Sequence, residues 1–177
     1  MFLPRKRAFT LFFLVIFGLM AVFSTFVPVG AAAGTQAAPL DQYKELAKVM
    51  THSFAAGLGS ALANVRNDKD RIDLVRSFIG PVRFFPDNSG YFYVYDSKGV
   101  NIAHAMQKDL QGKNLWDYKD AKGKLVLQAL LEASKKGGGF VDFYWVKPGT
   151  KEQMPKLGYV EPIPGTDYFI GTGVYLP

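Results

Sequence analysis

The sequence predicts an α+β fold, in which two N-terminal helices precede a five-stranded antiparallel sheet with one helix inserted between its second and third strands. Apolar residues recur at steps of three and four through residues 43–65, which is the spacing of one face of a helix. From Gly90 onward, short runs of aromatic and β-branched residues are separated by turns, as is typical of strands. Short turns join consecutive strands in antiparallel pairs, so these two patterns define the fold class.

Two helices are expected before the sheet. The first helix is expected over residues 43–65, with Asp41 as a candidate cap. Seven apolar side chains would form its inward face: Tyr43, Leu46, Met50, Phe54, Leu58, Leu62 and Val65. The second helix is expected over residues 69–78 and would end at the Gly80-Pro81 pair.

Five segments have the composition and length of strands, namely residues 91–95, 100–104, 140–146, 156–162 and 168–175. The turn at residues 96–99 would join the first two strands into a hairpin. The inserted helix is expected over residues 124–136, and the glycines at 137–139 would end it. A polar stretch over residues 107–120 and a loop over residues 147–155 would complete the connections.

Residues 1–33 have the three parts of a secretory signal. A basic segment precedes an uncharged apolar run over residues 8–29, and three consecutive alanines supply the small side chains that a signal peptidase requires. We therefore expect cleavage after the last of these alanines. A short lead over residues 34–39 and one folded domain over residues 40–177 would remain.

The apolar run is also long enough for an uncleaved membrane anchor, because about 20 helical residues cross the hydrocarbon core. Basic residues flank the run on its N-terminal side, so both interpretations place the domain outside the cytoplasm. The expected location is periplasmic or secreted, or else the inner membrane, with the N-terminal helix as the anchor.

The composition argues against several classes of function. The chain has no cysteine, which excludes disulfides, thiolate metal sites and a cysteine nucleophile. The two histidines lie far apart in the sequence and give no zinc-type spacing, and no nucleophile elbow occurs. Without the predicted signal, 18 basic and 15 acidic residues remain, and a net charge of +3 gives no footprint for nucleic acid. We therefore expect no catalytic residue, metal or cofactor.

Two local patterns favour rival interpretations. Residues 136–143, KGGGFVDF, match seven of the eight positions of an RNA-recognition signature, but Gly138 stands where that signature needs a base-stacking aromatic residue. We expect a chance match, produced where a glycine-terminated helix enters an aromatic strand. Asp117 and Asp120 lie close together in the polar stretch and are expected to be solvated loop acids.

The first strand predicts a polar cavity. The run YFYVY at residues 91–95 does not alternate between polar and apolar side chains, so both of its faces should be covered. Phe92 and Val94 would face the long helix, and Tyr91, Tyr93 and Tyr95 would face the opposite side. Buried phenols need hydrogen-bond partners, and a carboxylate accepts from several hydroxyls at once.

Four segments carry a resemblance to a known family, in that family's order and spacing: GYFYVYDSKGVNIAH, GKNLWDYKDAKGK, KKGGGFVDFYWVKPG and KLGYVEPIPGTDYFIGTGVYLP. They are similar to a single Cache domain of the type 2 subclass, from about residue 40 to the end. The resemblance implies a PAS-like sheet behind a long N-terminal helix and a periplasmic site for a small ligand, often a short carboxylic acid. Most members are sensor regions of chemoreceptors, kinases or cyclases.

This chain resembles the stand-alone form of that family, because it ends at the last strand without a second membrane span or a signalling domain. The expected function is therefore sensory binding of a small organic acid of the acetate, propionate, lactate or pyruvate class. A membrane receptor or kinase would be the partner. The alternative function is that of an accessory protein that presents a ligand to a membrane receptor, or a structural partner of one, and it would share the same fold.

Nine residues are candidates for the ligand site: Arg83, Tyr91, Tyr93, His104, Trp116, Tyr144, Trp145, Lys156 and Tyr159. Arg83 and Lys156 would supply positive charge, His104 can donate a hydrogen bond, and the aromatic side chains would form the walls. The resemblance implies a ligand role for six of the nine, because their motif positions match: Tyr91, Tyr93, His104, Tyr144, Lys156 and Tyr159.

Overall fold

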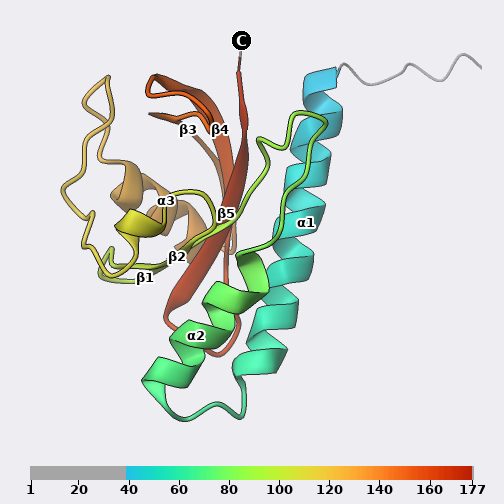
Figure 1. Ribbon diagram of the computed structural model, residues 1–177, viewed down its shortest axis with the longest axis vertical. Coiled ribbons are helices and arrows are strands. Elements are labelled where there is room, and N and C mark those ends of the chain that lie inside the picture. The colour runs from blue at the N-terminus through green and yellow to red at the C-terminus, as the bar shows by residue number, and fades with distance from the viewer. Residues whose placement is uncertain (1–38, 177) are drawn as a thin grey trace, which may run out of the picture. The chain divides into compact units, whose positions relative to one another are not determined.

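The computed structural model describes residues 39–176 (Figure 1). The predicted signal at residues 1–33 and all but the last residue of the lead lie outside the described residues. Among the helices described, none combines the length and the apolar character that crossing a membrane requires. In chain order the elements are α1 (Pro39–Leu62), α2 (Asp68–Ile79), β1 (Tyr93–Asp96), β2 (Asn101–His104), the 3-10 helix η1 (Lys108–Leu110), α3 (Val126–Lys135), β3 (Gly139–Val146), β4 (Gln153–Pro162) and β5 (Tyr168–Tyr175).

The five strands form one antiparallel sheet in the order β2-β1-β5-β4-β3, so the predicted fold class is confirmed. The strand boundaries differ from the prediction by two residues or more at β1 and β4 and by at most one residue elsewhere. Regular pairing in β1 begins at Tyr93, two residues later than expected. β4 begins at Gln153, three residues earlier, because Gln153 pairs with Val146 and the hairpin to β3 is longer than the expected loop allows.

The two faces of the sheet are covered by different helices. α1 packs against β4 and β5 and α2 against β2, while α3 packs against β3 and β4 (Figure 1). Side chains alternate between the faces along each strand. Phe92 and Val94 lie in the apolar cluster beneath α1 and α2, whereas Tyr91, Tyr93 and Tyr95 lie in a second cluster beneath α3. The alternation that the sequence predicted for these five residues is therefore confirmed.

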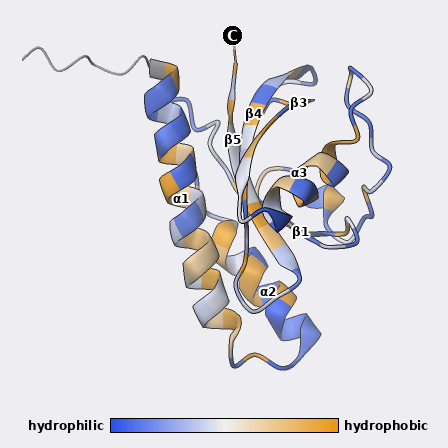
Figure 2. Ribbon diagram, turned by 180° about the vertical axis from the view of Figure 1, so that it is seen from behind, coloured by the Kyte–Doolittle hydropathy of each residue, from blue (hydrophilic) through white to orange (hydrophobic). Residues whose placement is uncertain are grey.

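Local side-chain and backbone features define where α2 begins and where the chain turns after α3. The Asn67 side chain accepts a hydrogen bond from the backbone N–H of Asp70 at 3.2 Å and so caps α2. In the hydropathy view, hydrophobic and hydrophilic residues follow one another along α1 and α2 (Figure 2). After α3, Gly138 has a φ of +122°, and a Cβ there would lie 2.9 Å from the Val160 carbonyl oxygen. That backbone requires glycine, which explains why the RNA-type signature lacks its aromatic residue.

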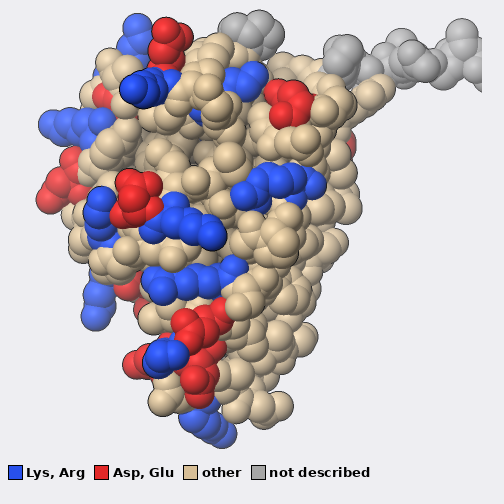
Figure 3. Space-filling model, viewed as in Figure 1, with Lys and Arg blue, Asp and Glu red and all other residues tan. Residues whose placement is uncertain are grey.

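β2 lies at one edge of the sheet, where backbone carbonyls without a strand partner could pair with another chain. Two arginines cover them: Arg76 Nε donates to the Ile102 carbonyl at 2.9 Å, and an Arg83 guanidinium nitrogen donates to the Ala105 carbonyl at 2.7 Å. On the face shown in Figure 3, basic and acidic side chains are interspersed, and no continuous basic surface is present there.

The expectation that Asp120 is solvated is wrong. Only 7% of the residue is exposed, and its carboxylate accepts backbone N–H groups from Lys122, Lys124 and Tyr144, each at 2.9 Å. Burial alone would raise the pKa of Asp120, but these hydrogen bonds outweigh it and hold the pKa below 3.8. Asp120 therefore fastens the loop before α3 to strand β3.

Candidate ligand-binding cavity

A small cavity lies between the sheet and α3. Ten side chains line it: Tyr91, Tyr93, Tyr95, His104, Val126, Leu127, Leu130, Phe143, Trp145 and Lys156. The cavity has a volume of about 10 Å³, which is room for about one water molecule. Five of the nine predicted site residues are brought together here, from four different segments of the chain.

Lys156 supplies the amine of this cavity. It is 1% exposed, and its Nζ lies 4.0 Å from the ring centre of Tyr91, 5.6 Å from that of Tyr93 and 4.7 Å from that of Tyr175. Among the described residues, no carboxylate pairs with it. Burial lowers the pKa of Lys156 well below 10.5, since the ring faces compensate only part of the lost hydration. A buried amine without a counter-ion is the arrangement that an anionic ligand would satisfy.

His104 is held as a neutral hydrogen-bond donor. Its Nδ1 accepts from the backbone N–H of Met106 at 3.3 Å and of Gln107 at 2.9 Å, so the ring proton must lie on Nε2. Nε2 has no hydrogen-bond partner among the described residues. Burial lowers the pKa of His104 to about 3, with smaller contributions from the charges of Lys156 and Arg83. At neutral pH the ring therefore offers one N–H group that lacks an acceptor.

The tyrosines add further donors. The Tyr175 hydroxyl donates to the Val146 carbonyl at 2.7 Å, so the Tyr91 hydroxyl donates to Tyr175 at 3.0 Å. The Tyr93 hydroxyl reaches only the Thr172 carbonyl, at 3.5 Å, which is a long contact. Burial raises the pKa of Tyr91 and of Tyr93 well above 10, so both remain protonated.

Two glycines of β5 allow these side chains to lie close to the sheet. A Cβ at Gly171 would stand 2.6 Å from the Tyr93 ring, and a Cβ at Gly173 would stand 2.9 Å from Lys156 Cε. Real Cβ atoms are essentially never found at such distances, so a larger residue would have to displace the Tyr93 ring at Gly171 and the β4 backbone at Gly173, where the Leu157 carbonyl oxygen would lie 2.6 Å from the added Cβ. The GTG run within β5 was a sequence signal for this site that the sequence analysis did not use.

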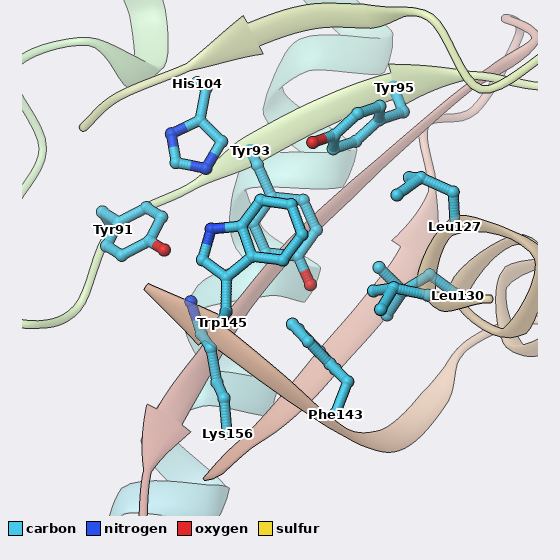
Figure 4. Close-up of a pocket in the computed structure, with 10 residues that line it drawn as sticks. Tyr91, Tyr93, Tyr95, His104, Leu127, Leu130, Phe143, Trp145 and Lys156 are labelled. Atoms are coloured by element: carbon cyan, nitrogen blue, oxygen red, sulfur yellow. The ribbon is translucent and has the colours of Figure 1, made fainter. Parts of the chain in front are cut away.

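The cavity is polar at one end and apolar at the other. In Figure 4, Lys156 extends toward Tyr91 and the His104 end, while Leu127 and Leu130 of α3 stand on the opposite side with Phe143. This arrangement suits a ligand with a charged acceptor group and a short hydrocarbon part. No cluster of three or more metal-ligating side chains occurs among the residues described.

Two predicted residues face away from the cavity because of strand alternation. Tyr144 lies between Phe143 and Trp145 on β3 and therefore points to the other side of the strand. Tyr159 lies toward α1, where its hydroxyl donates to Glu161 at 3.0 Å. The same carboxylate group contacts His52 of α1 at 3.0 Å. Neither tyrosine lines the cavity.

The other two predicted residues stand outside the cavity for different reasons. Arg83 donates to the carbonyl groups of Gly80, Val82 and Ala105, so its N–H groups are used within the backbone around the β2 edge. Trp116 lines an open surface hollow in the polar stretch and packs on the cluster beneath α3 from outside.

Five of the lining residues were not among the predicted site residues: Tyr95, Val126, Leu127, Leu130 and Phe143. Tyr95 shares the two-residue spacing of Tyr91 and Tyr93, so that spacing could have added it. The apolar residues look like ordinary core in the sequence, and only their packing opposite Lys156 identifies them as a wall.

Comparison with known proteins gives a consistent result. Residues 49–177 match the family described as Cache domain. The sensor histidine kinase MctS of Rhizobium johnstonii is 40% identical over 87 residues, which are 49% of this chain and 19% of the kinase. A chemotaxis protein structure from Vibrio parahaemolyticus superposes with a TM-score of 0.65 at 34% identity, covering 76% of this chain and 89% of that one.

A second solved structure concerns carboxylic acid recognition by a Cache chemosensory domain. It superposes with a TM-score of 0.65 at 26% identity, covering 79% of this chain and 99% of that one. Both structures are matched over nearly their whole length, whereas this chain spans less than a fifth of the kinase.

Proposed function

The chain belongs to the Cache domain family, and on this premise we propose that it is an extracytoplasmic sensing domain that binds a short-chain monocarboxylate. Relatives with this domain include a sensor histidine kinase and chemotaxis proteins, which supports a sensory role. A membrane receptor or kinase is the proposed partner.

One observation carries the choice of ligand, namely the excess of donors over acceptors at the polar end of the cavity. Lys156 Nζ lacks a carboxylate partner among the described residues, and His104 Nε2–H lacks any acceptor there. A carboxylate has two oxygens that accept several hydrogen bonds and carries the charge that a buried amine needs. Lys156 is the only cation among the ten lining residues, which favours one carboxylate over two.

The size of the cavity adds a condition. Acetate, the smallest of the expected acids, has four non-hydrogen atoms, and a cavity of about 10 Å³ accommodates about one water. Binding must therefore move part of the wall. α3 supplies the apolar side of that wall, so displacement of α3 is the proposed first consequence of binding.

The test is a thermal-shift and calorimetric screen of the purified chain against acetate, propionate, lactate and pyruvate, with acetamide as a neutral analogue. We expect the acids to raise the melting temperature and acetamide to leave it unchanged. Lys156→Met should weaken acid binding at least about 100-fold, because an unpaired carboxylate in a buried site costs several kcal/mol. The matched control is Lys124→Met, which removes a surface lysine paired with Asp142 at 2.7 Å.

Retained affinity in Lys156→Met would contradict the proposed site. If no acid shifted the wild-type protein, the carboxylate proposal would fail, and a partner-binding role without a small ligand would be favoured instead.

A further inference from the structure

Gln107 joins two side chains of the cavity without lining it. Its backbone N–H donates to His104 Nδ1 at 2.9 Å. Its side-chain Oε1 accepts from Trp145 Nε1 at 2.7 Å. The residue lies just before η1, at the point where the chain leaves the sheet for the polar stretch, so it connects the end of β2 to Trp145 near the C-terminal end of β3.

Each of these two bonds fixes a property of the cavity. The bond to His104 helps to keep the imidazole proton on Nε2, where a ligand would meet it. The bond to Trp145 uses the indole N–H, so this donor is already paired and is not free for a ligand. Trp145 is 7% exposed and stacks on His104 with ring centres 6.3 Å apart and an interplanar angle of 20°.

We infer that Gln107 is a positioning residue for the cavity, one that acts on a ligand through His104 and Trp145 rather than by contact. By fixing the indole, Gln107 gives the cavity one rigid wall and leaves Lys156 and His104 as the principal donors for a ligand. The expected effect of Gln107 on ligand affinity rests on the proposed function, whereas its effect on the orientation of Trp145 can be observed without a ligand.

Gln107→Leu tests the side-chain bond, because it keeps the backbone N–H and removes only the acceptor for the indole. We expect a loss of roughly 2- to 10-fold in propionate affinity, the range of one hydrogen bond. Gln111→Leu is the matched control, since Gln111 lies in the same stretch and no hydrogen bond of its side chain is present in the described structure.

A double-mutant cycle separates positioning from general damage. Trp145→Phe removes the indole N–H, so Gln107→Leu should cost little further affinity in that background. The chain has two tryptophans, so a Trp116→Phe background makes Trp145 the sole indole emitter. In that background Gln107→Leu should change the emission of Trp145, and Gln111→Leu should not.

Unchanged emission and affinity in Gln107→Leu would overturn the inference, as would an equally large loss of affinity in the Trp145→Phe background. If the wild-type chain bound no carboxylate, the proposed function would fail separately. The emission of Trp145 would then decide, with a change supporting the positioning role and no change overturning it.

Discussion

The two faces of this sheet use the same strands for different purposes. The face beneath α1 and α2 is almost entirely apolar, with Phe92, Val94 and Ile170 buried against Leu58 and Ile79. The face beneath α3 has tyrosine, histidine and lysine in equally buried positions. The first face gains stability from the burial of apolar groups, whereas the second buries the His104 Nε2–H and the Lys156 amine, for which the described residues supply no acceptor and no carboxylate, respectively.

The difference shows where this fold accepts an energetic cost. A buried polar group without a partner destabilises the folded state, so such groups persist where a ligand supplies the partner. Lys156 of β4 and His104 of β2 both point to the α3 face of the sheet, and the residues next to them on these strands point to the opposite face. The apolar face provides the rigid support, and the polar face provides recognition.

The largest expected effects come from truncating one leucine on each face. Leu58→Ala and Leu130→Ala should each lower the free energy of unfolding by about 2–5 kcal/mol, because each residue is at most 2% exposed. Only Leu130→Ala enlarges the ligand cavity, so only this variant should shift binding preference toward longer acids. Denaturant unfolding and calorimetry with acids of two to five carbons measure the two effects. An equal shift of preference in Leu58→Ala would remove the distinction between the faces.

Asp120→Asn comes next in size. The two carboxylate oxygens of Asp120 accept three backbone N–H groups between them. Asparagine keeps one acceptor oxygen, and the NH2 group in place of the other oxygen cannot accept. We expect a loss of roughly 1.5–3 kcal/mol at pH 7. The pKa of Asp120 is depressed in the folded state, so this stability is present above the unfolded pKa and is lost as the pH falls through the folded value. A wild-type advantage over Asp120→Asn that did not shrink on acidification would contradict this assignment.

The contrast between the faces also shows what the sequence could predict. The helical periodicity, and the short aromatic and β-branched runs separated by turns after Gly90, were sufficient to predict the fold class, because both patterns depend on local spacing. The alternation of residues 91–95 was sufficient to separate the two faces at β1. Strand order was not available from spacing, and it is the order β2-β1-β5-β4-β3 that brings Lys156 of β4 beneath Tyr91. Asp120 was misjudged, and the contacts of Arg83 at the β2 edge were not foreseen, because the partners of both side chains are backbone groups, which leave no mark in the sequence.

The pH dependence of binding distinguishes the faces further, because only the face beneath α3 contains a buried lysine. Burial lowers the pKa of Lys156, so the unfolded chain binds more protons than the empty folded domain, and the stability of the empty domain should rise with pH. A bound carboxylate favours the ammonium form, so binding takes up a proton. Affinity should then fall by up to about tenfold per pH unit, which is about 1.4 kcal/mol, between the Lys156 pKa values of the empty and bound states.

Other groups around Lys156 should not contribute to this slope. His104, with a pKa of about 3, stays neutral, and burial raises the pKa of Tyr91, Tyr93 and Tyr175, so these phenols stay protonated. Calorimetry in two buffers of different ionisation enthalpy counts the protons taken up, and Lys156→Met should lose the pH-dependent stability term. Affinity that stayed constant from about pH 6 to pH 9, without proton uptake, would mean that Lys156 does not change its protonation state on binding in that range.

The smallest expected effect belongs to Arg83, which was predicted to lie in the ligand site. Its guanidinium donates to three backbone carbonyls, and the side chain is half-buried at the β2 edge, so water can replace part of what is lost. Arg83→Ala should lower the free energy of unfolding by about 1 kcal/mol. It should change carboxylate affinity less than Lys156→Met does. Since Arg83 holds the Ala105 carbonyl next to His104, any change in affinity should reflect a displaced imidazole rather than a lost contact with the anion. A loss of affinity as large as that of Lys156→Met, at unchanged stability, would instead place the Arg83 guanidinium in contact with the ligand once the cavity opens.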